Sequence, residues 1–463
     1  MNRQKKPKTA LHFVGIGGDG MSALAKVCHE MGFAVSGSNI CENQRTRELR
    51  ALGLPIALGH DASHLQDADA VVFSSAIPTD NVELRAARRR GLPIVHRLEL
   101  LRTLMSDRYS IGVTGTHGKT TTAAMIATLL MRAQLDPTFI VGAASPTLGT
   151  HARFGRGRHL VAEVCESDGY FLQLHPQIAV VTSIGRDHLS TYGSEHALRQ
   201  SFRQFVQQSE RAVVCADDPG IQEAILQESH AALTYRIERP ADLVAYDLEL
   251  EGEQTRFAIA WRGRPVGAIE LNVPGKHNIY NALAALSVGR LLGLTFQQMA
   301  AYLREFQLPE RRFEFLLRSP MVLIDDYAHL PEQIQTNLET IRTAWRPARV
   351  IALFQPHRYS RLSYLGEEFG RAFALADEVI VTDIYAAFES PIEDVNIGRL
   401  LEALRRHHAR VRYLSPGEDL SRCLQESCRP GDWVIAFNAG DLSHRLRQAA
   451  MSFGKGVSDD GIF

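Results

Sequence analysis

One short stretch, residues 111–122, constrains the fold more than any other part of the chain. It reads Ile-Gly-Val-Thr-Gly-Thr-His-Gly-Lys-Thr-Thr-Thr, so a β-branched run breaks into glycines and then into a helix start. This pattern predicts a strand, a phosphate-binding loop and a helix, because the N–H groups of a glycine-rich turn at a helix N-terminus can surround a phosphate. We therefore expect a nucleotide at the edge of an α/β sheet.

The loop predicts ATP as its ligand, with Lys119 on the terminal phosphates and the Thr120 hydroxyl on Mg²⁺. The first glycine of the standard pattern falls on Val113, so the generic pattern is not strictly met. Lys119 is one of 7 lysines in a chain with 44 arginines, and a compact charge on a flexible stem suits a γ-phosphate. A chance strand-turn-helix with a solvated lysine is the alternative. The residues predicted to bind the nucleotide here are Gly115, Thr116, His117, Gly118, Lys119, Thr120 and Thr121.

Length and composition set broad limits on the class of protein. A chain of 463 residues suggests about three domains, and 45% hydrophobic with 22% charged residues is an ordinary globular composition. The formal net charge of -1 provides no overall field for nucleic acid or anionic lipid. We therefore expect no nucleic-acid partner.

Location and redox state follow from the same reading. No apolar run of about 18 residues is available for a membrane span, and the N-terminus leads into a strand rather than a signal-peptide apolar region. We expect a cytoplasmic protein with no membrane partner. The six cysteines are scattered without a C-x-x-C pair, so we expect reduced thiols with no metal role.

The N-terminal segment carries a second glycine pattern, residues 15–20, between a strand at 11–14 and a helix at 21–31. G-x-G-x-x-G in this position is typical of a Rossmann-type diphosphate site. A dinucleotide site also needs an acid at the end of the second strand, where this chain has Ser38-Asn39, so NAD is disfavoured and a UDP-type ligand stays open. A structural glycine turn is the alternative. The predicted substrate-binding residues are Gly15, Gly17, Gly18, Gly20, Met21, Ser22, Ser38, Ser74 and Ser75.

Alternating strands and helices continue through this segment. Strands are expected at 70–75 and 93–95, with helices at 82–90 and 97–105, and this alternation predicts a parallel sheet covered on both faces. A boundary is expected at 105–108, since a new strand begins at Tyr109.

In the second segment, an acid cluster and a histidine follow two apolar strands. Glu163, Glu166 and Asp168 lie at the end of the strand at 160–164, and His188 follows the strand at 178–184. Ligands bind outside the carboxyl ends of parallel strands, so the loop, Glu166 and His188 should converge. Mg²⁺ prefers oxygen ligands, so we expect Thr120 and Glu166 to bind it together with phosphate oxygens. His188 either joins them or orients a water or phosphate; a solvated acid and a structural histidine are the alternatives.

Further along, residues 230–272 predict short hairpin-like strands, and Pro274-Gly275 opens a helix with a strongly apolar face at 282–292. Asn278 lies near the N-terminus of that helix. Its amide could read an adenine edge or cap the helix, and both interpretations stay open.

The third segment predicts another α/β sheet from apolar strands at 321–324, 350–354, 379–382 and 433–437. Polar residues follow these strands, as expected for a crevice along one edge of a sheet. Ordinary turn chemistry explains any single one of them equally well.

Taken together, these residues resemble the Mur ligase family. The motifs of the resemblance are Gly15-Ile16-Gly17-Gly18-Asp19-Gly20-Met21-Ser22, Gly115-Thr116-His117-Gly118-Lys119-Thr120-Thr121, Glu166-Ser167-Asp168-Gly169, Asp187-His188, Gly275-Lys276-His277-Asn278, Arg311-Arg312-Phe313-Glu314, Asp325-Asp326-Tyr327-Ala328-His329 and Phe354-Gln355-Pro356-His357-Arg358-Tyr359. Their order along nearly the whole chain makes the resemblance specific.

The resemblance implies an α/β fold of three domains: a Rossmann-like UDP-substrate domain at 1–106, a P-loop-type ATPase domain at 107–314 and a Rossmann-like amino-acid-binding domain at 315–463. It implies a ligase that uses ATP and Mg²⁺ to join L-alanine to the carboxylate of UDP-N-acetylmuramate through an acyl phosphate, in peptidoglycan precursor synthesis. A monomer or weak homodimer is expected. A sister ligase that adds a peptide or another amino acid, and a non-catalytic nucleotide-binding protein, remain as rival hypotheses.

Residue roles also follow from the resemblance. It places Lys119 on the phosphates; Thr120, Glu166 and His188 around magnesium; and Asn278 and Arg312 on the nucleotide. It assigns Tyr327, His329, His357 and Arg358, with Lys119 and His188, to catalysis. The general base for the amine is left open among His188, His329 and His357.

The chain departs from the family pattern at three places. Asn39 stands where the family usually has Asp, Val164-Cys165 replaces Ala-Asp in the acid motif, and Leu330 replaces a second histidine. No lysine lies between 119 and 276, although several sister ligases have a carbamylated lysine in this domain. In lacking this lysine, the chain is similar to the alanine-adding branch of the family.

Overall fold

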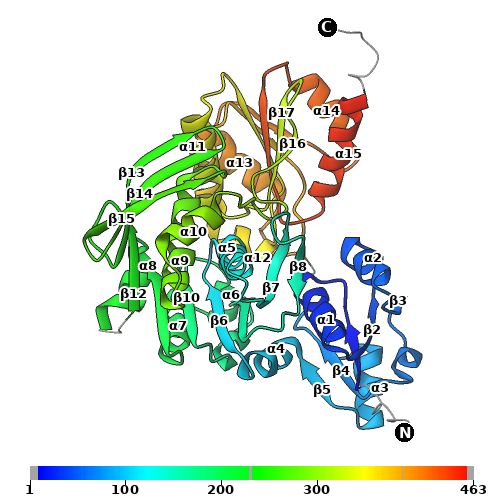
Figure 1. The fold of residues 1–463 in the computed structure, drawn as a ribbon. Helices are drawn as coiled ribbons and strands as arrows, with labels where there is room; N and C mark the ends of the chain where they lie inside the picture. Colours follow the sequence, from blue (N-terminus) through cyan, green and yellow to red (C-terminus); the bar gives the residue numbers. More distant parts are fainter. Residues whose placement is uncertain (1–8, 229–231, 388, 456–463) are drawn as a thin grey trace. The chain divides into compact units, whose positions relative to one another are not determined.

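The computed structural model describes residues 9–228, 232–387 and 389–455, which form sheets of five, ten and six strands (Figure 1). The predicted α/β fold is confirmed. The chain divides into two compact units: Met1–Tyr246, Ala258–Ile269 and Tyr280–Gln307 in the first, and Asp247–Phe257, Glu270–Ile279 and Leu308–Phe463 in the second. The domain bounds expected from the sequence remain a prediction.

The first sheet is parallel throughout, with the order β3-β2-β1-β4-β5. Its elements are β1 (Ala10–Val14), α1 (Asp19–Met31), β2 (Ala34–Asn39), α2 (Gln44–Ala51), β3 (Ile56–Leu58), β4 (Ala70–Phe73), α3 (Val82–Arg90), β5 (Ile94–His96) and α4 (Arg97–Ser106). The strand order reverses at β1, so the loops after β1 and β4 flank the topological switch point where such sheets bind ligands. The helix α2 and the strand β3 were not expected from the sequence.

The ten-stranded sheet has the order β15-β14-β13-β12-β11-β10-β6-β9-β7-β8. Its strands are β6 (Tyr109–Thr114), β7 (Thr138–Ser145), β8 (Thr150–Arg153), β9 (His159–Glu163), β10 (Ile178–Val181), β11 (Arg211–Cys215), β12 (Ala232–Ile237), β13 (Leu243–Glu251), β14 (Gln254–Trp261) and β15 (Arg264–Leu271). Because β6 pairs in parallel with both β9 and β10, the segments that follow these three strands meet at one edge.

Helices cover this sheet, and α5 is its most buried one, since every side chain from residue 120 to 130 is buried. The helices are α5 (Lys119–Arg132), α6 (Leu189–Tyr192), α7 (Glu195–Gln207), α8 (Pro219–Ala224), α9 (Lys276–Leu291) and α10 (Phe296–Leu303). Every residue of β10 is apolar and buried, as expected for a parallel strand with both faces of its sheet covered.

The third sheet, in the second unit, has the order β16-β17-β21-β18-β19-β20 and is parallel except for β16. Its elements are β16 (Glu314–Leu317), β17 (Val322–Asp326), α11 (Pro331–Ala344), β18 (Val350–Phe354), α12 (Tyr359–Ala372), β19 (Glu378–Val381), α13 (Ile397–His407), β20 (Val411–Tyr413), α14 (Leu420–Ser427), β21 (Trp433–Phe437) and α15 (Leu442–Lys455). Alternate strand residues enter two separate cores, with Ile324 in one and Leu323 in the other, so both faces of the sheet are covered.

Two further expectations can be compared with the structure. All six cysteines lie in the described residues and are free thiols. Among the helices of the described residues, none combines the length and apolarity that crossing a bilayer requires.

Candidate nucleotide and substrate site

The loop between β6 and α5 depends on two glycines. Gly115 has a φ of 131°, and a Cβ atom there would lie 2.3 Å from Thr182 Oγ1. Gly118 has a φ of 78°, and its Cβ would lie 2.4 Å from Asn281 Oδ1. Side-chain-bearing residues are excluded at both positions by conformation and by space. The loop therefore turns tightly enough to present its N–H groups at the start of α5.

Lys119 emerges from this loop toward an acid. Its Nζ lies 3.0 Å from Glu166 Oε1 and donates to the Gly115 carbonyl. Burial lowers the pKa of Lys119, but Glu166 together with Cys165 and Glu163 more than offsets this and raises the pKa above its ordinary value. The lysine is therefore a fixed cation at neutral pH.

Glu166 is almost fully buried, and its Oε2 atom has no hydrogen-bond partner among the described residues. His188, in the left-handed conformation with a φ of 56°, brings Nε2 to 4.0 Å from Glu166 Oε1 and 3.4 Å from Asp187 Oδ2. The expected convergence of Lys119, Glu166 and His188 is thus present in the first unit.

The donor set suits Mg²⁺ better than a transition metal. In the part of the chain that the structure describes, no group of three or more His, Cys, Asp and Glu side chains forms a metal site by itself. Mg²⁺ is commonly held by one or two protein oxygens plus phosphate oxygens and water. The unpartnered Glu166 Oε2 fits that role, and the buried Thr120 lies one residue from Lys119 at the start of α5.

Other residues of the loop contact the segment that follows β10. The Gly185 N–H donates to Thr116 Oγ1 at 2.7 Å, and the His117 N–H donates to Ser183 Oγ at 2.9 Å. Thr121 is buried on α5. These bonds hold the loop against the segment that follows β10. Thr116 and His117, which were predicted to bind the nucleotide, therefore help to fix the conformation of the loop.

Sequence reasoning missed Asn281. Its buried side chain accepts a hydrogen bond from Thr122 Oγ1 at 3.2 Å, and its Oδ1 occupies the space beside Gly118. Asn278 was expected either at adenine or as a helix cap. Its amide, in the second unit, is buried and donates to the Pro274 carbonyl at 2.7 Å. The helical spacing of 278 and 281 was the available signal, since these positions share one face of α9.

The first glycine loop follows β1. The N–H groups of Gly15 and Ile16 both donate to the Ser38 carbonyl, and the Gly17 N–H donates to Asn39 Oδ1 at 3.2 Å. Asn39, the departure from the family's Asp, is therefore a direct support of the loop.

The Ser38 side chain is fully buried behind this loop. Its hydroxyl donates to Glu83 Oε2 at 2.6 Å and lies 3.0 Å from His60 Nδ1. Three histidines surround the same carboxylate: His12, His60 and His64, at 3.7, 3.4 and 2.7 Å. Burial tends to raise the pKa of Glu83, but the adjacent side chains of His12, Ser38 and His64 lower it to about 2.

The serines after β4 face different partners. Ser75 Oγ donates to Asp168 Oδ2 at 2.9 Å, whereas Ser74 is half-buried and its carbonyl accepts from the Ile77 N–H. Arg97, which sequence reasoning missed, approaches the same Asp168 oxygen at 3.4 Å. Its guanidinium also lies beside Gly20, where a Cβ atom would be 3.3 Å from Nη1, so a cation stands at the start of α1.

The start of α1 carries the remaining predicted substrate residues. Gly18 is exposed at the N-cap of the helix, and Met21 is buried beneath it. The hydroxyl of the buried Ser22 donates to the Asp19 carbonyl and lies 3.3 Å from His151 Nε2.

In the second unit, the predicted catalytic residues gather at the carboxyl ends of β17 and β18. Tyr327 meets His329 edge-on at 5.4 Å between ring centroids, and His329 lies 5.8 Å from the His357 ring. His357 stacks on Tyr385 at 5.7 Å, and the Arg358 N–H donates to the Tyr385 carbonyl. Tyr385 was missed, although it follows the expected strand at 379–382.

Arginines surround this aromatic row. The guanidinium carbons of Arg311 and Arg312 lie 4.9 and 4.8 Å from the Tyr327 ring centroid, which is cation–π geometry. Arg358, with a φ of 72°, has Nη1 at 3.9 Å from Glu389, while its Nε is buried without a hydrogen-bond partner among the described residues. Leu330, the third departure, is buried in the core of this unit. The edge is thus rich in fixed positive charge.

Comparison with known proteins gives consistent results along the chain. Models of the Mur ligase family match residues 10–109 (the catalytic domain of the family), 113–289 (the middle domain) and 311–440 (the glutamate ligase domain). The UDP-N-acetylmuramate–L-alanine ligase of Pelotomaculum thermopropionicum is 42% identical over 441 residues, covering 94% of this chain and 95% of that protein. The corresponding ligase of Gloeobacter violaceus is 43% identical over 435 residues, covering 93% of each.

Solved structures show the same likeness. The crystal structure of a UDP-N-acetylmuramate–alanine ligase from Thermotoga maritima superposes with a TM-score of 0.84 at 29% identity, covering 96% of this chain and 99% of that one. A murein peptide ligase from Psychrobacter arcticus shares the fold, with a TM-score of 0.71 at 20% identity over 98% of this chain and 100% of its own.

Proposed function

The chain belongs to the Mur ligase family, and on that basis we propose that it joins L-alanine to the carboxylate of UDP-N-acetylmuramate at the expense of ATP. The observation that carries the proposal is the Lys119–Glu166 pair at the mouth of a glycine loop that tolerates no other residue at its turns. The names of the relatives, at 42–43% identity over nearly the whole chain, support the choice of substrates.

The proposed reaction has two steps. A carboxylate oxygen of the muramoyl group attacks the γ-phosphorus of ATP, the bond to the β–γ bridging oxygen breaks, and ADP leaves. The alanine amine then attacks the acyl carbon, the bond to the phosphate oxygen breaks, and phosphate leaves as the amine loses a proton. The products are UDP-N-acetylmuramoyl-L-alanine, ADP and phosphate.

Lys119 contributes to the first step by neutralising charge on the transferred group. Phosphoryl transfer depends mainly on positioning and electrostatic stabilisation, and a largely buried lysine that stays protonated supplies both. Thr120 and Glu166 would hold Mg²⁺, with His188 beside them, and the ion would neutralise phosphate charge when bound.

The first sheet would hold the UDP end of the substrate. The exposed Gly18 at the N-cap of α1, with Arg97 beside Gly20, suits a diphosphate, because a helix N-terminus and a guanidinium both attract anions. Ser38 would act through Glu83 and the loop rather than by touching the ligand.

The edge of the third sheet would hold the amino acid. Arg358 and its neighbours offer guanidinium groups for the carboxylate of alanine, and His329 and His357 border the same place. The proton acceptor for the amine stays open among His188, His329 and His357.

Phosphate release by the purified protein tests the proposal, with ATP, Mg²⁺, UDP-N-acetylmuramate and L-alanine present and each omitted in turn. We expect release only with the complete set, and a product whose mass equals the nucleotide sugar plus one alanine residue. Lys119→Ala sets the background; release by the wild type that does not exceed it overturns the enzyme assignment.

A panel of amino acids and a tripeptide tests the second substrate. Failure of L-alanine together with success of the tripeptide would identify a peptide-adding ligase instead. We further propose a cytoplasmic protein that acts as a monomer or weak homodimer without nucleic-acid or membrane partners, for which gel filtration and cell fractionation are the tests.

A further inference from the structure

Three polar side chains form a stripe along α1 at a spacing of four residues: Ser22, Lys26 and Glu30, called here the polar stripe. Residues four apart lie on one face of a helix, so the stripe faces a single neighbour. That neighbour is the hairpin β7–β8 of the ten-stranded sheet, and both α1 and this hairpin lie in the first unit.

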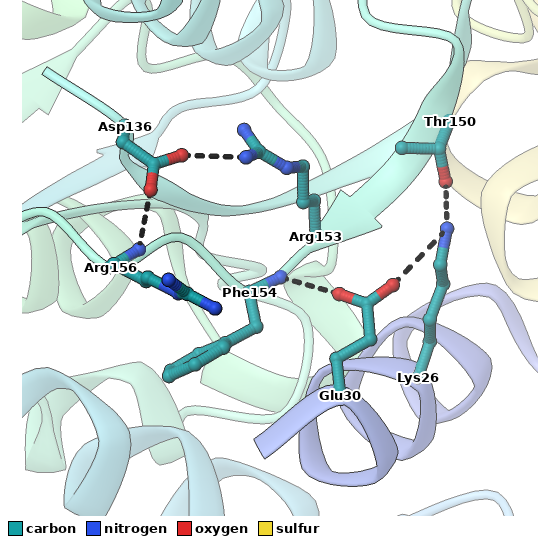
Figure 2. Close-up of a pocket in the computed structure, with 7 residues that line it drawn as sticks. All are labelled: Lys26, Glu30, Asp136, Thr150, Arg153, Phe154 and Arg156. Carbon is teal, nitrogen blue, oxygen red and sulfur yellow. Dashed lines mark hydrogen bonds and ion pairs between the residues drawn. The ribbon is translucent and has the colours of Figure 1, made fainter. Parts of the chain in front are cut away.

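Two members of the stripe, Lys26 and Glu30, contact the β8 end of this hairpin as Figure 2 shows. Lys26 Nζ donates to Thr150 Oγ1 at 2.6 Å, and Glu30 Oε2 accepts from the Phe154 N–H at 2.7 Å. Lys26 Nζ also lies 3.9 Å from Glu30 Oε1, so the ammonium group contacts both a carboxylate of its own helix and a hydroxyl of the hairpin. The Lys26 side chain is only 16% exposed, and this burial lowers the pKa of its ammonium group.

The contact at Ser22 is more deeply buried. His151 Nε2 lies 3.3 Å from Ser22 Oγ, and both side chains are almost fully buried. Burial, followed by the charge of Arg45, lowers the pKa of His151 to about 4, so the imidazole is neutral at pH 7. A neutral ring can pair with a hydroxyl without adding a charge to the interface.

Through β7, the same hairpin reaches the loop between β6 and α5 together with the first residue of α5, residues 115–119, called here the nucleotide loop. The Gly142 N–H on β7 donates to Glu163 Oε2 at 2.8 Å, at the end of β9 and three residues before Glu166. A Cβ atom at Gly142 would lie 2.9 Å from Thr120 Oγ1, so β7 passes directly against the start of α5. One hairpin therefore connects α1, which begins at the first glycine loop, with the residues that surround Lys119.

We infer that the polar stripe is a positioning element for the ligase reaction: by holding α1 on the hairpin β7–β8, it sets the first glycine loop at the correct distance from the nucleotide loop. The inference rests on the proposed function, in which the two loops hold the two reactants of the first step. Attack on the γ-phosphorus needs the atoms within about 3.5 Å, and a displacement of about 1 Å can cost about a hundredfold in rate.

Lys26→Met tests this, because it removes the ammonium and keeps the unbranched stem. We expect kcat for product formation to fall about tenfold while the dissociation constants of ADP and UDP-N-acetylmuramate, each measured alone, change less than about twofold. Lys26→Arg should restore kcat. Thr150→Val removes the acceptor, and the double variant should lose no more than either single one.

A matched control is Arg132→Met, which breaks an exposed ion pair with Glu305 of 2.7 Å in the same unit. Unchanged kcat in Lys26→Met, or an equal loss in the control, overturns the inference, as does a parallel loss of ADP affinity. If the wild type forms no product, the proposed function fails instead.

Hydrogen exchange tests the contact without turnover. The Phe154 amide should exchange faster in Lys26→Met and in Glu30→Ala than in the wild type, because its acceptor is displaced or removed. Exchange at the wild-type rate in both variants overturns the inference, even if Lys26→Met proves too unstable for kinetics.

Discussion

Glu166 Oε1 lies 3.0 Å from Lys119 Nζ, so the lysine of the nucleotide loop already has an anionic partner. A γ-phosphate must share that lysine with Glu166, while the second carboxylate oxygen remains buried without a partner among the described residues. Lys119, the candidate cation for the phosphate, is therefore in direct contact with Glu166, the candidate ligand for Mg²⁺.

Glu166→Gln separates these two roles. Because the variant keeps the shape and removes the competing charge, ADP binding in the presence of EDTA should be as tight as in the wild type or tighter, by calorimetry. Turnover with Mg²⁺ should fall about a hundredfold, as expected for loss of a group that positions charge. Glu305→Gln, at an exposed acid paired with Arg132, is the control and should behave as the wild type. Weaker ADP binding without metal would contradict the assignment.

Gly118→Ala should weaken nucleotide binding. The new Cβ would meet Asn281 Oδ1 at 2.4 Å on a backbone with a φ of 78°. Gly149→Ala is a close control, because Gly149 has a φ of 69° but open space around its Cβ position, so it carries only the conformational cost of about 1 kcal/mol. We expect the dissociation constant of ADP to rise at least about tenfold in the first variant, from a loss of about 1.4 kcal/mol. Equal affinities would show that the turn does not bind the phosphates.

Tyr192→Phe should weaken Mg²⁺ binding by removing a hydrogen bond that supports Glu166. Tyr192 ends the short helix α6, which begins directly after His188, and its hydroxyl donates to the Glu166 carbonyl. Thr191 Oγ1 donates to the Ser167 carbonyl at 2.8 Å, so α6 ties the histidine to the acid segment. Losing one hydrogen bond should cost about 1 kcal/mol of stability, and turnover should need more Mg²⁺ for half-saturation. Tyr170→Phe, at an exposed ring stacked on His96, is the comparison; the same Mg²⁺ titration curve in both would refute the role.

Glu83 should make stability depend on pH. Its pKa is about 2 in the folded chain against an ordinary 4.5, so its charge stabilises the fold fully above pH 4.5, and this contribution is lost as the pH falls from 4.5 toward 2. Glu83→Gln should therefore lower the free energy of unfolding by about 3 kcal/mol at pH 7. In urea unfolding the gap to the wild type should narrow below pH 4.5. Glu305→Gln, at an exposed acid, should show no such gap; a gap that is constant from pH 7 to pH 3 would contradict the linkage.

The nucleotide loop could be predicted from the sequence because its requirements are local. A β-branched strand, two glycines in left-handed turns and a helix start lie within 12 consecutive residues, and each preference acts over one or two peptide units. The place of Glu166 beside the loop also followed, since parallel strands bring their carboxyl ends to one edge.

The partners of single polar side chains could not be predicted in this way. Ser22 and Ser38 lie in the glycine-loop region, yet one hydroxyl faces His151 and the other Glu83, at separations of 129 and 45 residues. Asn278 and Asn281 share a helix, but the Asn281 side chain lies beside Gly118 whereas the Asn278 amide donates to the Pro274 carbonyl. Nothing in the local sequence distinguishes a serine that faces a ligand from one that faces a buried acid.

The amino-acid sequence by itself determined the family, the three sheets and the position of the phosphate loop, because hydrophobic period and turn chemistry are properties of neighbouring residues. Only the tertiary structure decided which acid pairs with Lys119, which histidines surround Glu83 and that α1 is held on the hairpin β7–β8. Those contacts join residues far apart in the chain, and their energies depend on burial and distance, which exist only once the chain has folded.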